Sequence, residues 1–355
     1  MPQNIKKLLE NGTLATSAPC RVDMGGTLDI KTIYLPMQHL RPATFNLAID
    51  LRTEITLLPY DGDKIKVSSR GFESTAFDAG EAPYHHPLGL MFAVADYFNV
   101  SGLHIRIDSS SPPRSALGGS SAAAVALVCA LASLHDKGPL SRRQIALVAH
   151  AIEEAAARVP CGIQDQLAAV YGGANAWYWR SSAGCPDFNR TIVLDGKQCD
   201  QFNDRFIVAY CGIPHESKDI NGRWMDHFIR AGDRALWREI IACSRSFIDA
   251  LKGDRINDAI AAMNRDSALR KQMTPDVFDD MGESLAAAAG EAACGVRFTG
   301  AGGGGCVWAI GEPGNIGHLK KRWETIVQNR ADACLLKTGI DTRGLSVPEG
   351  IDITD

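Results

Sequence analysis

Apolar and polar residues alternate along NLAIDLRTEITLL at residues 46–58 and again along LHIRI at residues 103–107. A period of two residues is typical of a strand that buries one face, so we expect a sheet in the first half of the chain. Two short runs of strand-forming residues, FIVAY at 206–210 and CVWAI at 306–310, predict strands in the second half.

Other segments favour helices. Residues 120–135, SSAAAVALVCALASLH, are alanine-rich without proline or glycine, which predicts a core helix that is apolar nearly all round. A second helix is expected from Ser141, which can form a capping box with Gln144, to just before Pro160. AGEAAC (289–294) and HLKKRWETIVQNR (318–330) also suggest helices. Because strands and helices do not alternate regularly, the pattern favours an α+β fold.

The composition indicates a large, folded, two-domain protein. The chain has 355 residues, 45% of them hydrophobic, and its polar, turn-rich stretch 181–204 suggests a domain boundary near residue 200. The first residues contain no apolar signal core, and the longest apolar run, 122–132, is too short to span a bilayer. We therefore expect neither secretion nor membrane insertion.

Charge and cysteine usage narrow the choice of partners. The net charge is −4 and the basic residues are scattered, which argues against nucleic acid as a partner. The ten cysteines stand singly without a C-x-x-C pair, as expected for reduced thiols in a cytoplasmic protein. The sequence does not distinguish a monomer from a homodimer.

A glycine-rich and serine-rich loop precedes the predicted core helix. SSSPPRSALGGSS at residues 109–121 runs from a strand into the first turn of that helix, where free N–H groups and the helix dipole favour an anion. The chain has no G-x-x-x-x-G-K-[ST] string, so phosphates would be held by backbone amides and serines. The alternative is a solvated turn with Ser120 as an ordinary N-cap.

A second glycine loop, TGAGGGGC at residues 299–306, happens to match G-x-G-x-x-G. The dinucleotide fingerprint needs a helix directly after the glycines, whereas CVWAI predicts a strand, so we reject a Rossmann motif here. So many small residues have little packing value, which favours a close backbone approach to a ligand over a plain turn.

Two acids flank the break at Pro160. Glu154 lies near the end of one predicted helix, and Asp165 lies near the start of the next. An aspartate can accept the proton of an attacking hydroxyl, and a glutamate with a serine suits Mg²⁺. The alternatives are a solvated Glu154 on a helix surface and Asp165 as an N-cap.

Four segments, in this order, resemble the GHMP kinases: SAPCRVDMGGTLD (17–29), PPRSALGGSSAAA (112–124), CGIQDQ (161–166) and RFTGAGGGGCV (297–307). The resemblance implies the two-domain α+β fold of that superfamily, with ATP and Mg²⁺ in the cleft between domains. Residues 1–200 would form a ribosomal-protein-S5-like domain with the phosphate loop and catalytic aspartate. Residues 201–355 would form a ferredoxin-like sandwich domain carrying the glycine-rich motif at 297–307.

The resemblance also implies roles for individual residues. Asp165 would be the catalytic acid-base residue, Arg21 would steady it and the transferring phosphoryl group, and Ser120 and Glu154 would hold Mg²⁺. Asp29 would bind sugar hydroxyls. The nucleotide-binding set would be Pro113, Ser115, Ala116, Leu117, Gly118, Gly119, Ser120, Ser121, Gly302, Gly303 and Gly304, and the substrate-binding set would be Gly26, Thr27, Asp29, Asp165 and Tyr171.

The motifs depart from the family pattern in places. Ala116 and Gly119 replace the first glycine and first serine of the phosphate loop, and the first motif is one residue shorter between Arg21 and Asp29. GGT at residues 25–27 stands where galactokinases have a Glu-His pair. QDQLAAVYGGAN (164–175) is similar to heptokinases, and APCRVD (18–23) is similar to fucokinases.

These features favour a cytoplasmic sugar 1-kinase of the heptokinase and fucokinase type. A galactokinase is the main alternative, and a sugar sensor that binds both ligands without turnover stays open. Homoserine and mevalonate kinases lack QDQ in their motifs, and the diphosphate decarboxylases lack the sugar-type first motif. The side chains His39, Tyr171, Asn175 and His215 are further candidates for the sugar pocket.

Overall fold

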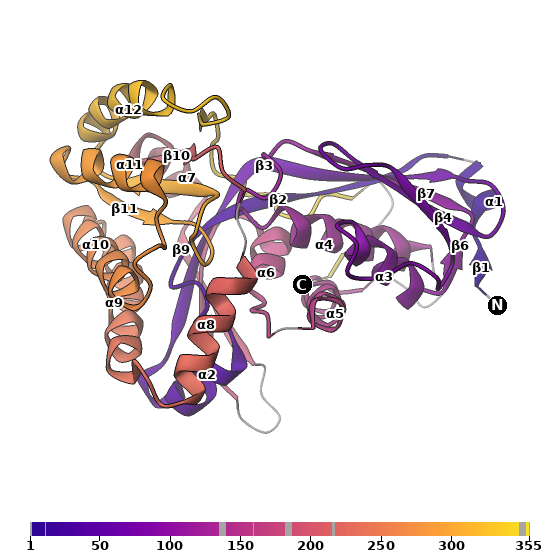
Figure 1. Cartoon of the computed structure of the whole chain (residues 1–355), viewed down its shortest axis with the longest axis horizontal. Helices are drawn as coiled ribbons and strands as arrows, with labels where there is room; N and C mark the ends of the chain where they lie inside the picture. The colour runs from indigo at the N-terminus through magenta and orange to yellow at the C-terminus, as the bar shows by residue number, and fades with distance from the viewer. Residues whose placement is uncertain are drawn as a thin grey trace.

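The computed structural model describes residues 2–10, 12–134, 140–158, 160–181, 187–214, 217–347 and 353–354. Two sheets carry the fold (Figure 1). The larger sheet has the order β5-β4-β7-β3-β8-β9, with β2 paired to β3. Its strands are β2 (Leu14–Met24), β3 (Ala43–Pro59), β4 (Lys64–Ser69), β5 (Thr75–Asp78), β7 (Leu103–Ser109), β8 (Ala174–Trp179) and β9 (Phe188–Leu194).

The alternating segment 46–58 lies within β3, the long strand that organises this sheet. One edge of β3 pairs with β2, and the other is shared between β8 at residues 43–47 and β7 at residues 53–59. The β2–β3 register shifts between Pro19 and Cys20. Near the end of β2, the Asp23 carbonyl accepts hydrogen bonds from Arg297 and Trp308, which belong to the second sheet.

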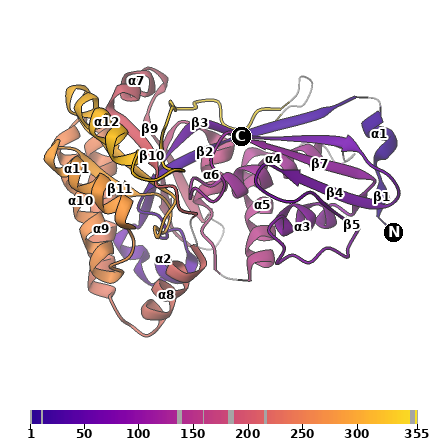
Figure 2. The same cartoon turned by 45° about the horizontal axis from the view of Figure 1, so that its top comes forward.

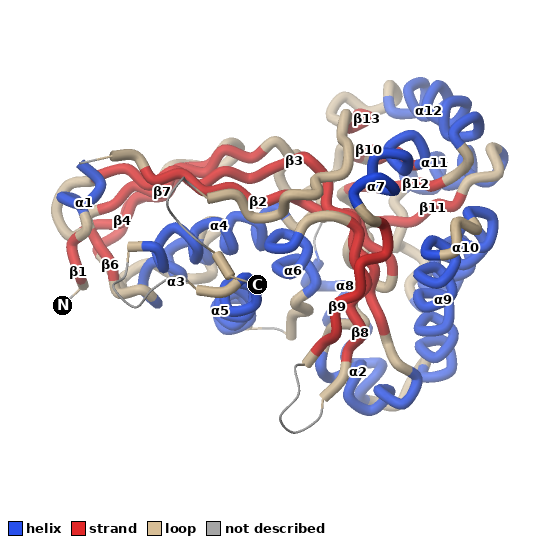
Figure 3. Tube along the Cα trace, turned by 180° about the vertical axis from the view of Figure 1, so that it is seen from behind, coloured by secondary structure: helices blue, strands red, loops and turns tan. Residues whose placement is uncertain are grey.

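Helices α3 (Gly89–Tyr97), α4 (Gly119–Ser133), α5 (Arg142–Ala157) and α6 (Gln164–Tyr171) lie on one side of the larger sheet, as Figure 3 shows from behind. Every residue of α4 from Ser121 to Ala132 is buried, which confirms the predicted core helix. The capping box of Ser141 and Gln144 is present at the start of α5. Helix α5 ends at Ala157, three residues before Pro160.

The smaller sheet is antiparallel with the order β11-β12-β10-β13. Its strands are β10 (Phe206–Tyr210), β11 (Gly295–Phe298), β12 (Cys306–Ile310) and β13 (Cys334–Leu336), so both strands predicted in the second half are confirmed. The helices that follow β9 are α7 (Gly196–Phe202), α8 (Ser217–Ile229), α9 (Arg234–Lys252), α10 (Ile256–Met273), α11 (Asp280–Glu291) and α12 (Pro313–Val327). Figure 2 shows α9 to α12 gathered at the end of the molecule away from the N-terminus.

The expected helices of the second half are found in part. The segment 318–330 falls mostly within α12. The expectation for 289–294 is wrong at its end, because α11 stops at Glu291 and Ala293 adopts a left-handed conformation with φ of 53°. That turn reverses the chain into β11, so Ala292 and Ala293 do not extend the helix.

The remaining elements are short: α1 (Lys6–Glu10), α2 (Lys31–Met37), the parallel pair β1 (Gln3–Asn4) and β6 (Val100–Ser101), and 3-10 turns at Gln38–Leu40 and Asn203–Arg205. The mixed layers confirm the α+β class. The domain division near residue 200 stays a prediction, and residues 338–346 return to the larger sheet through bridges from Ile340 to Ile49 and from Ser346 to Ser17. No helix in the described ranges is long and apolar enough to cross a membrane.

Candidate active site

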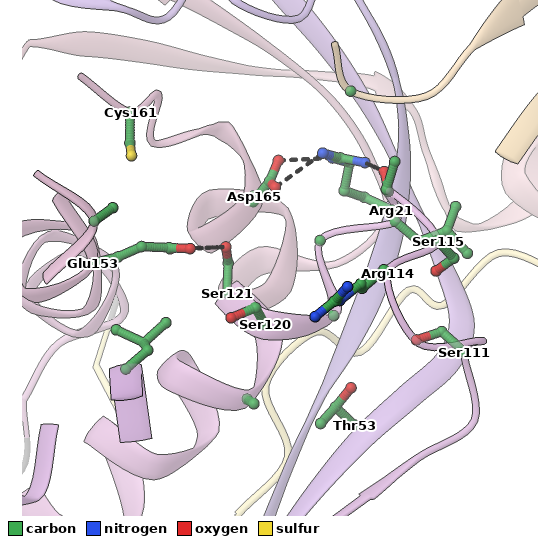
Figure 4. Close-up of a pocket in the computed structure, with 18 of the residues that line it drawn as sticks. Arg21, Thr53, Ser111, Arg114, Ser115, Ser120, Ser121, Glu153, Cys161 and Asp165 are labelled. Atoms are coloured by element: carbon green, nitrogen blue, oxygen red, sulfur yellow. Dashed lines mark hydrogen bonds and ion pairs between the residues drawn. The ribbon is translucent and has the colours of Figure 1, made fainter. Parts of the chain in front are cut away.

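A cavity of about 610 Å³ is bounded by the phosphate loop, by α4, α5, α6 and α8, and by the start of the second glycine loop. Figure 4 shows Arg21, Glu153 and Asp165 around this cavity. The serines of the phosphate loop and α4 that line it are Ser111, Ser115, Ser120 and Ser121. The elements therefore bring residues of all four sequence motifs to one place.

The phosphate loop (residues 110–118) connects β7 to α4. Arg114, Ala116 and Gly118 have φ of 53°, 61° and 74°, and Gly118 is the residue before the first turn of α4. These left-handed residues wind the loop around the amino end of α4, whose free N–H groups and dipole attract an anion. The helix begins at Gly119, so Ser120 lies in its first turn and is not the N-cap.

Arg21 and Asp165 form a bidentate ion pair at the wall of the cavity. Arg21 Nε lies 2.7 Å from Asp165 Oδ1 and Nη2 lies 2.9 Å from Oδ2, while Nη1 donates to the Ala116 carbonyl at 2.6 Å. Burial lowers the pKa of Arg21, but the Asp165 and Asp23 carboxylates outweigh it and raise the pKa above its ordinary value. Arg21 thus fixes the orientation of Asp165 and ties it to the phosphate loop.

Glu153, and not Glu154, faces the serines of α4. Glu153 Oε2 accepts a hydrogen bond from Ser121 Oγ at 2.9 Å and another from the Gln166 side chain, whereas Glu154 is exposed. Burial raises the pKa of Glu153 to about 7, and Asp165 also raises it. The structure therefore does not bring the expected Glu154 to the cavity, because the cavity side of α5 carries the residue before it.

The donor set at this end suits Mg²⁺. Both hydrogen-bond donors to Glu153 are neutral, so a cation would relieve the cost of ionising this carboxylate. Ser120 also lines the cavity and offers a hydroxyl. Among the described residues, no group of three His, Cys, Asp or Glu side chains could hold an ion without help. Mg²⁺ binds through one or two carboxylates together with phosphate oxygens and water, so the Glu153 carboxylate and the serine hydroxyls are suitable ligands.

Asp29 also lines the cavity. The Gln164 N–H donates to Asp29 Oδ2 at 3.0 Å, and Oδ1 is buried without a hydrogen-bond partner among the described residues. The pKa of Asp29 is raised to about 7, chiefly by burial, and the charge of Asp165 contributes to this rise. A β-carbon on Gly162 would lie 1.7 Å from Oδ2, so only glycine fits beside this carboxylate.

The second glycine loop (residues 300–305) contacts the cavity at its start. Gly300 and Ala301 line the wall, and the Gly300 N–H donates to Asp23 Oδ1 at 2.7 Å. The predicted Gly302, Gly303 and Gly304 are absent from the described lining, so their nucleotide role stays a prediction. Strand β12 follows directly, in agreement with the rejection of a Rossmann motif.

Other expected sugar contacts lie elsewhere. Tyr171 packs against Trp177, Asn175 bonds Arg190 and the Gly172 carbonyl, and His39 is exposed in a 3-10 turn. His215 lies outside the described residues. Gly26 sits behind the wall, whereas Thr27 lines the cavity.

Several cavity residues were not foreseen: Arg70, Phe72, Met91, Glu153, Cys161, Asn221 and Met225. The helical period could have favoured Glu153, because it lies eight residues from buried Ile145 and four from buried Ala149, on the core-facing side of α5.

Residues 86–173 match the family described as GHMP kinases N terminal domain. This segment of the chain is similar to that domain. The match spans α3 to α6 and includes the phosphate loop, Glu153 and Asp165. The resemblance to the GHMP kinases is therefore confirmed for the segment that carries most of the candidate site.

Solved structures of several small-molecule kinases share the fold over nearly the whole chain. A D-glycero-D-manno-heptose 1-phosphate kinase from Bacteriodes thetaiotaomicron has a TM-score of 0.71 at 15% identity, over 95% of this chain and 99% of that one. Lactococcus lactis galactokinase complexed with galactose has a TM-score of 0.69 at 16% identity, over 96% and 99%.

A phosphomevalonate kinase from Streptococcus pneumoniae, in complex with phosphomevalonate and AMPPNP, has a TM-score of 0.72 at 14% identity, over 93% and 100%. The comparison with curated proteins found no match. At these identities the similarity establishes the fold, which both sugar kinases and mevalonate-type kinases share.

Proposed function

We propose that this protein is an ATP-dependent kinase that transfers the γ-phosphate of ATP to a sugar hydroxyl, the anomeric 1-OH in particular. The observation that carries the proposal is the Arg21–Asp165 pair, which stands between the amino end of α4 and the unpaired Asp29 carboxylate oxygen. An anion site, a positioned base and an acceptor pocket thus meet in one cavity.

The residues suggest an in-line transfer. The acceptor hydroxyl would give its proton to an Asp165 carboxylate oxygen as its oxygen forms the new bond to the γ-phosphorus, and the bond from that phosphorus to the bridging oxygen of ADP would break. Arg21, the amino end of α4 and the phosphate-loop amides would stabilise the charge on the transferring group. Glu153 with Ser120 and Ser121 would hold Mg²⁺, which when bound neutralises phosphate charge.

The acceptor end supports a polyhydroxylated substrate. Asp29 Oδ1 offers a buried acceptor, and burying it without a partner is costly, so a ligand hydroxyl that donates to it would bind favourably. A heptokinase-like or fucokinase-like activity follows from the first motif and QDQ segment. A galactokinase is the second candidate, and it is supported by the acid Asp29 in the proposed acceptor pocket. The single cysteines further support a reducing, cytoplasmic setting.

The test is an ADP-release assay with ATP and Mg²⁺ over galactose, fucose, mannose, their amino forms and mannoheptose 7-phosphate. We expect turnover with one acceptor and a loss of at least about a hundredfold in kcat for Asp165→Asn. Asp200→Asn, an exposed aspartate on α7, serves as the matched control. Binding of ATP and a sugar without ADP from any acceptor would instead identify a sensor, and equal activity of the two variants would contradict the role of Asp165.

A further inference from the structure

A series of buried ion pairs leads away from the cavity, starting at Arg21 and Asp165. Arg297 Nη1 donates to Asp23 Oδ2 at 2.9 Å and its Nε to Asp266 Oδ2 at 2.8 Å, and Asp23 Oδ1 lies 3.6 Å from Arg21 Nη1. In this series of ion pairs, three arginines alternate with three aspartates in the order Arg270, Asp266, Arg297, Asp23, Arg21, Asp165. Except for Asp165, these side chains are at most 5% exposed.

Arg270 of α10 is the last member of this series. It contacts the loop at residues 25–29, which we call the acceptor loop. Its Nη1 donates to Thr27 Oγ1 at 2.9 Å and its Nη2 donates to the Gly26 carbonyl at 2.7 Å. Thr27 has φ of 73°, a left-handed conformation that is strained for a threonine. The two donors of the guanidinium thus bond the loop at the residue whose backbone is strained and at the carbonyl before it.

The same guanidinium lies between two tryptophans. Its carbon is 4.8 Å from the ring centre of Trp224 on α8 and 5.1 Å from that of Trp237 on α9. Both distances are within the range of cation–π attraction. Trp224 is anchored in turn by its Nε1, which donates to Thr274 Oγ1 at 2.7 Å. Helix α8 also supplies Asn221 and Met225 to the cavity, so Arg270 connects two separate parts of the acceptor end.

We propose that Arg270 is a positioning residue that fixes the acceptor loop against α8, and so sets the shape of the acceptor pocket around Asp29. Only the expected change in KM rests on the proposed function; the expected effect on the acceptor loop does not. A merely stabilising role could be filled by well-packed apolar side chains, which often replace buried ion pairs without loss of stability. Two donors aimed at a strained loop indicate that geometry is what Arg270 supplies.

The variants for the test are Arg270→Lys, which keeps the charge but loses the planar fork, and Arg270→Met, which keeps much of the length without charge. Arg265→Lys is the matched control, because Arg265 lies on the same helix in an exposed pair with Glu239. We expect Arg270→Lys to raise the KM for the acceptor at least about tenfold and to change the KM for ATP by less than about twofold.

Hydrogen exchange followed by mass spectrometry gives a second measurement that needs no turnover. Amides of residues 25–29 should exchange faster in both Arg270 variants than in wild type and Arg265→Lys, while amides of α4 stay unchanged. If the wild type phosphorylates no acceptor, the proposed function fails and the exchange result alone decides the role of Arg270. Unchanged exchange at 25–29, or equal rises in both KM values, would overturn the inference.

Discussion

Replacing Glu153 by glutamine should stabilise the protein above pH 7 and leave its stability near pH 4.5 almost unchanged. Glu153 is a carboxylic acid in the cavity wall, and the two side chains that donate hydrogen bonds to it, Ser121 and Gln166, are neutral. Burial disfavours its charged form, so its pKa rises from 4.5 to about 7. Glutamine has nearly the same shape and cannot ionise.

The sign and size follow from proton linkage. Below pH 4.5 both the folded and unfolded proteins keep this proton, and the group then costs nothing. As pH rises towards about 7 the unfolded chain ionises first, so the free energy of unfolding falls. A rise in pKa from 4.5 to about 7 corresponds to a loss of about 3 kcal/mol, complete above pH 7.

The assay is urea denaturation of wild type, Glu153→Gln and Glu154→Gln at pH 5, 6, 7 and 8, followed by tryptophan fluorescence. Glu154 is the matched control because it is the exposed neighbour on the same helix. The stability gained in Glu153→Gln should grow with pH up to about 3 kcal/mol, whereas Glu154→Gln should stay within about 0.5 kcal/mol of wild type. A gain that is independent of pH, or equal in the two variants, would refute the reasoning.

Two glycine substitutions test the ends of the site. Gly162→Ala should raise the KM for the acceptor and spare that for ATP, because its β-carbon would lie 1.7 Å from Asp29 Oδ2 and must displace that carboxylate. Gly305→Ala should weaken ATP binding in calorimetry and cost about 1–3 kcal/mol of stability, because its φ is 79° and its β-carbon would lie 2.7 Å from the Ser115 carbonyl. Gly314→Ala, whose β-carbon meets nothing within 4 Å, should change none of these quantities.

The fold was largely predictable because local patterns agree with the final packing. About ten residues of sequence are enough to predict each of three elements: the alternating strand β3, the apolar helix α4 and the capped start of α5. The pairing of β3 with three different strands has no local signal. It depends on contacts between residues far apart in the chain, such as Thr53 with Ser109 and Leu47 with Ala174.

The site residues inside the sequence motifs could be predicted, whereas those outside the motifs mostly could not. Arg21 and Asp165 meet as the resemblance implied, since each belongs to a motif with a fixed local shape. The choice between Glu153 and Glu154 depends on the rotation of α5 against α4, which two adjacent glutamates do not reveal. Arg270 stands outside every motif, so only the folded structure shows that it reaches Thr27.

The return of residues 338–346 to the larger sheet has a consequence for synthesis. On one edge of β3, residues 48–52 lie between the part paired with β8 and the part paired with β7. These residues bond to the tail instead: the Asp50 N–H donates to the Gly339 carbonyl, and the Asp341 N–H donates to the Ala48 carbonyl. Arg52 closes the same seam by donating to the Gly344 carbonyl. While the ribosome is still making α12, the first-made sheet has an open seam. The nascent chain therefore completes its earliest layer only when its late residues emerge.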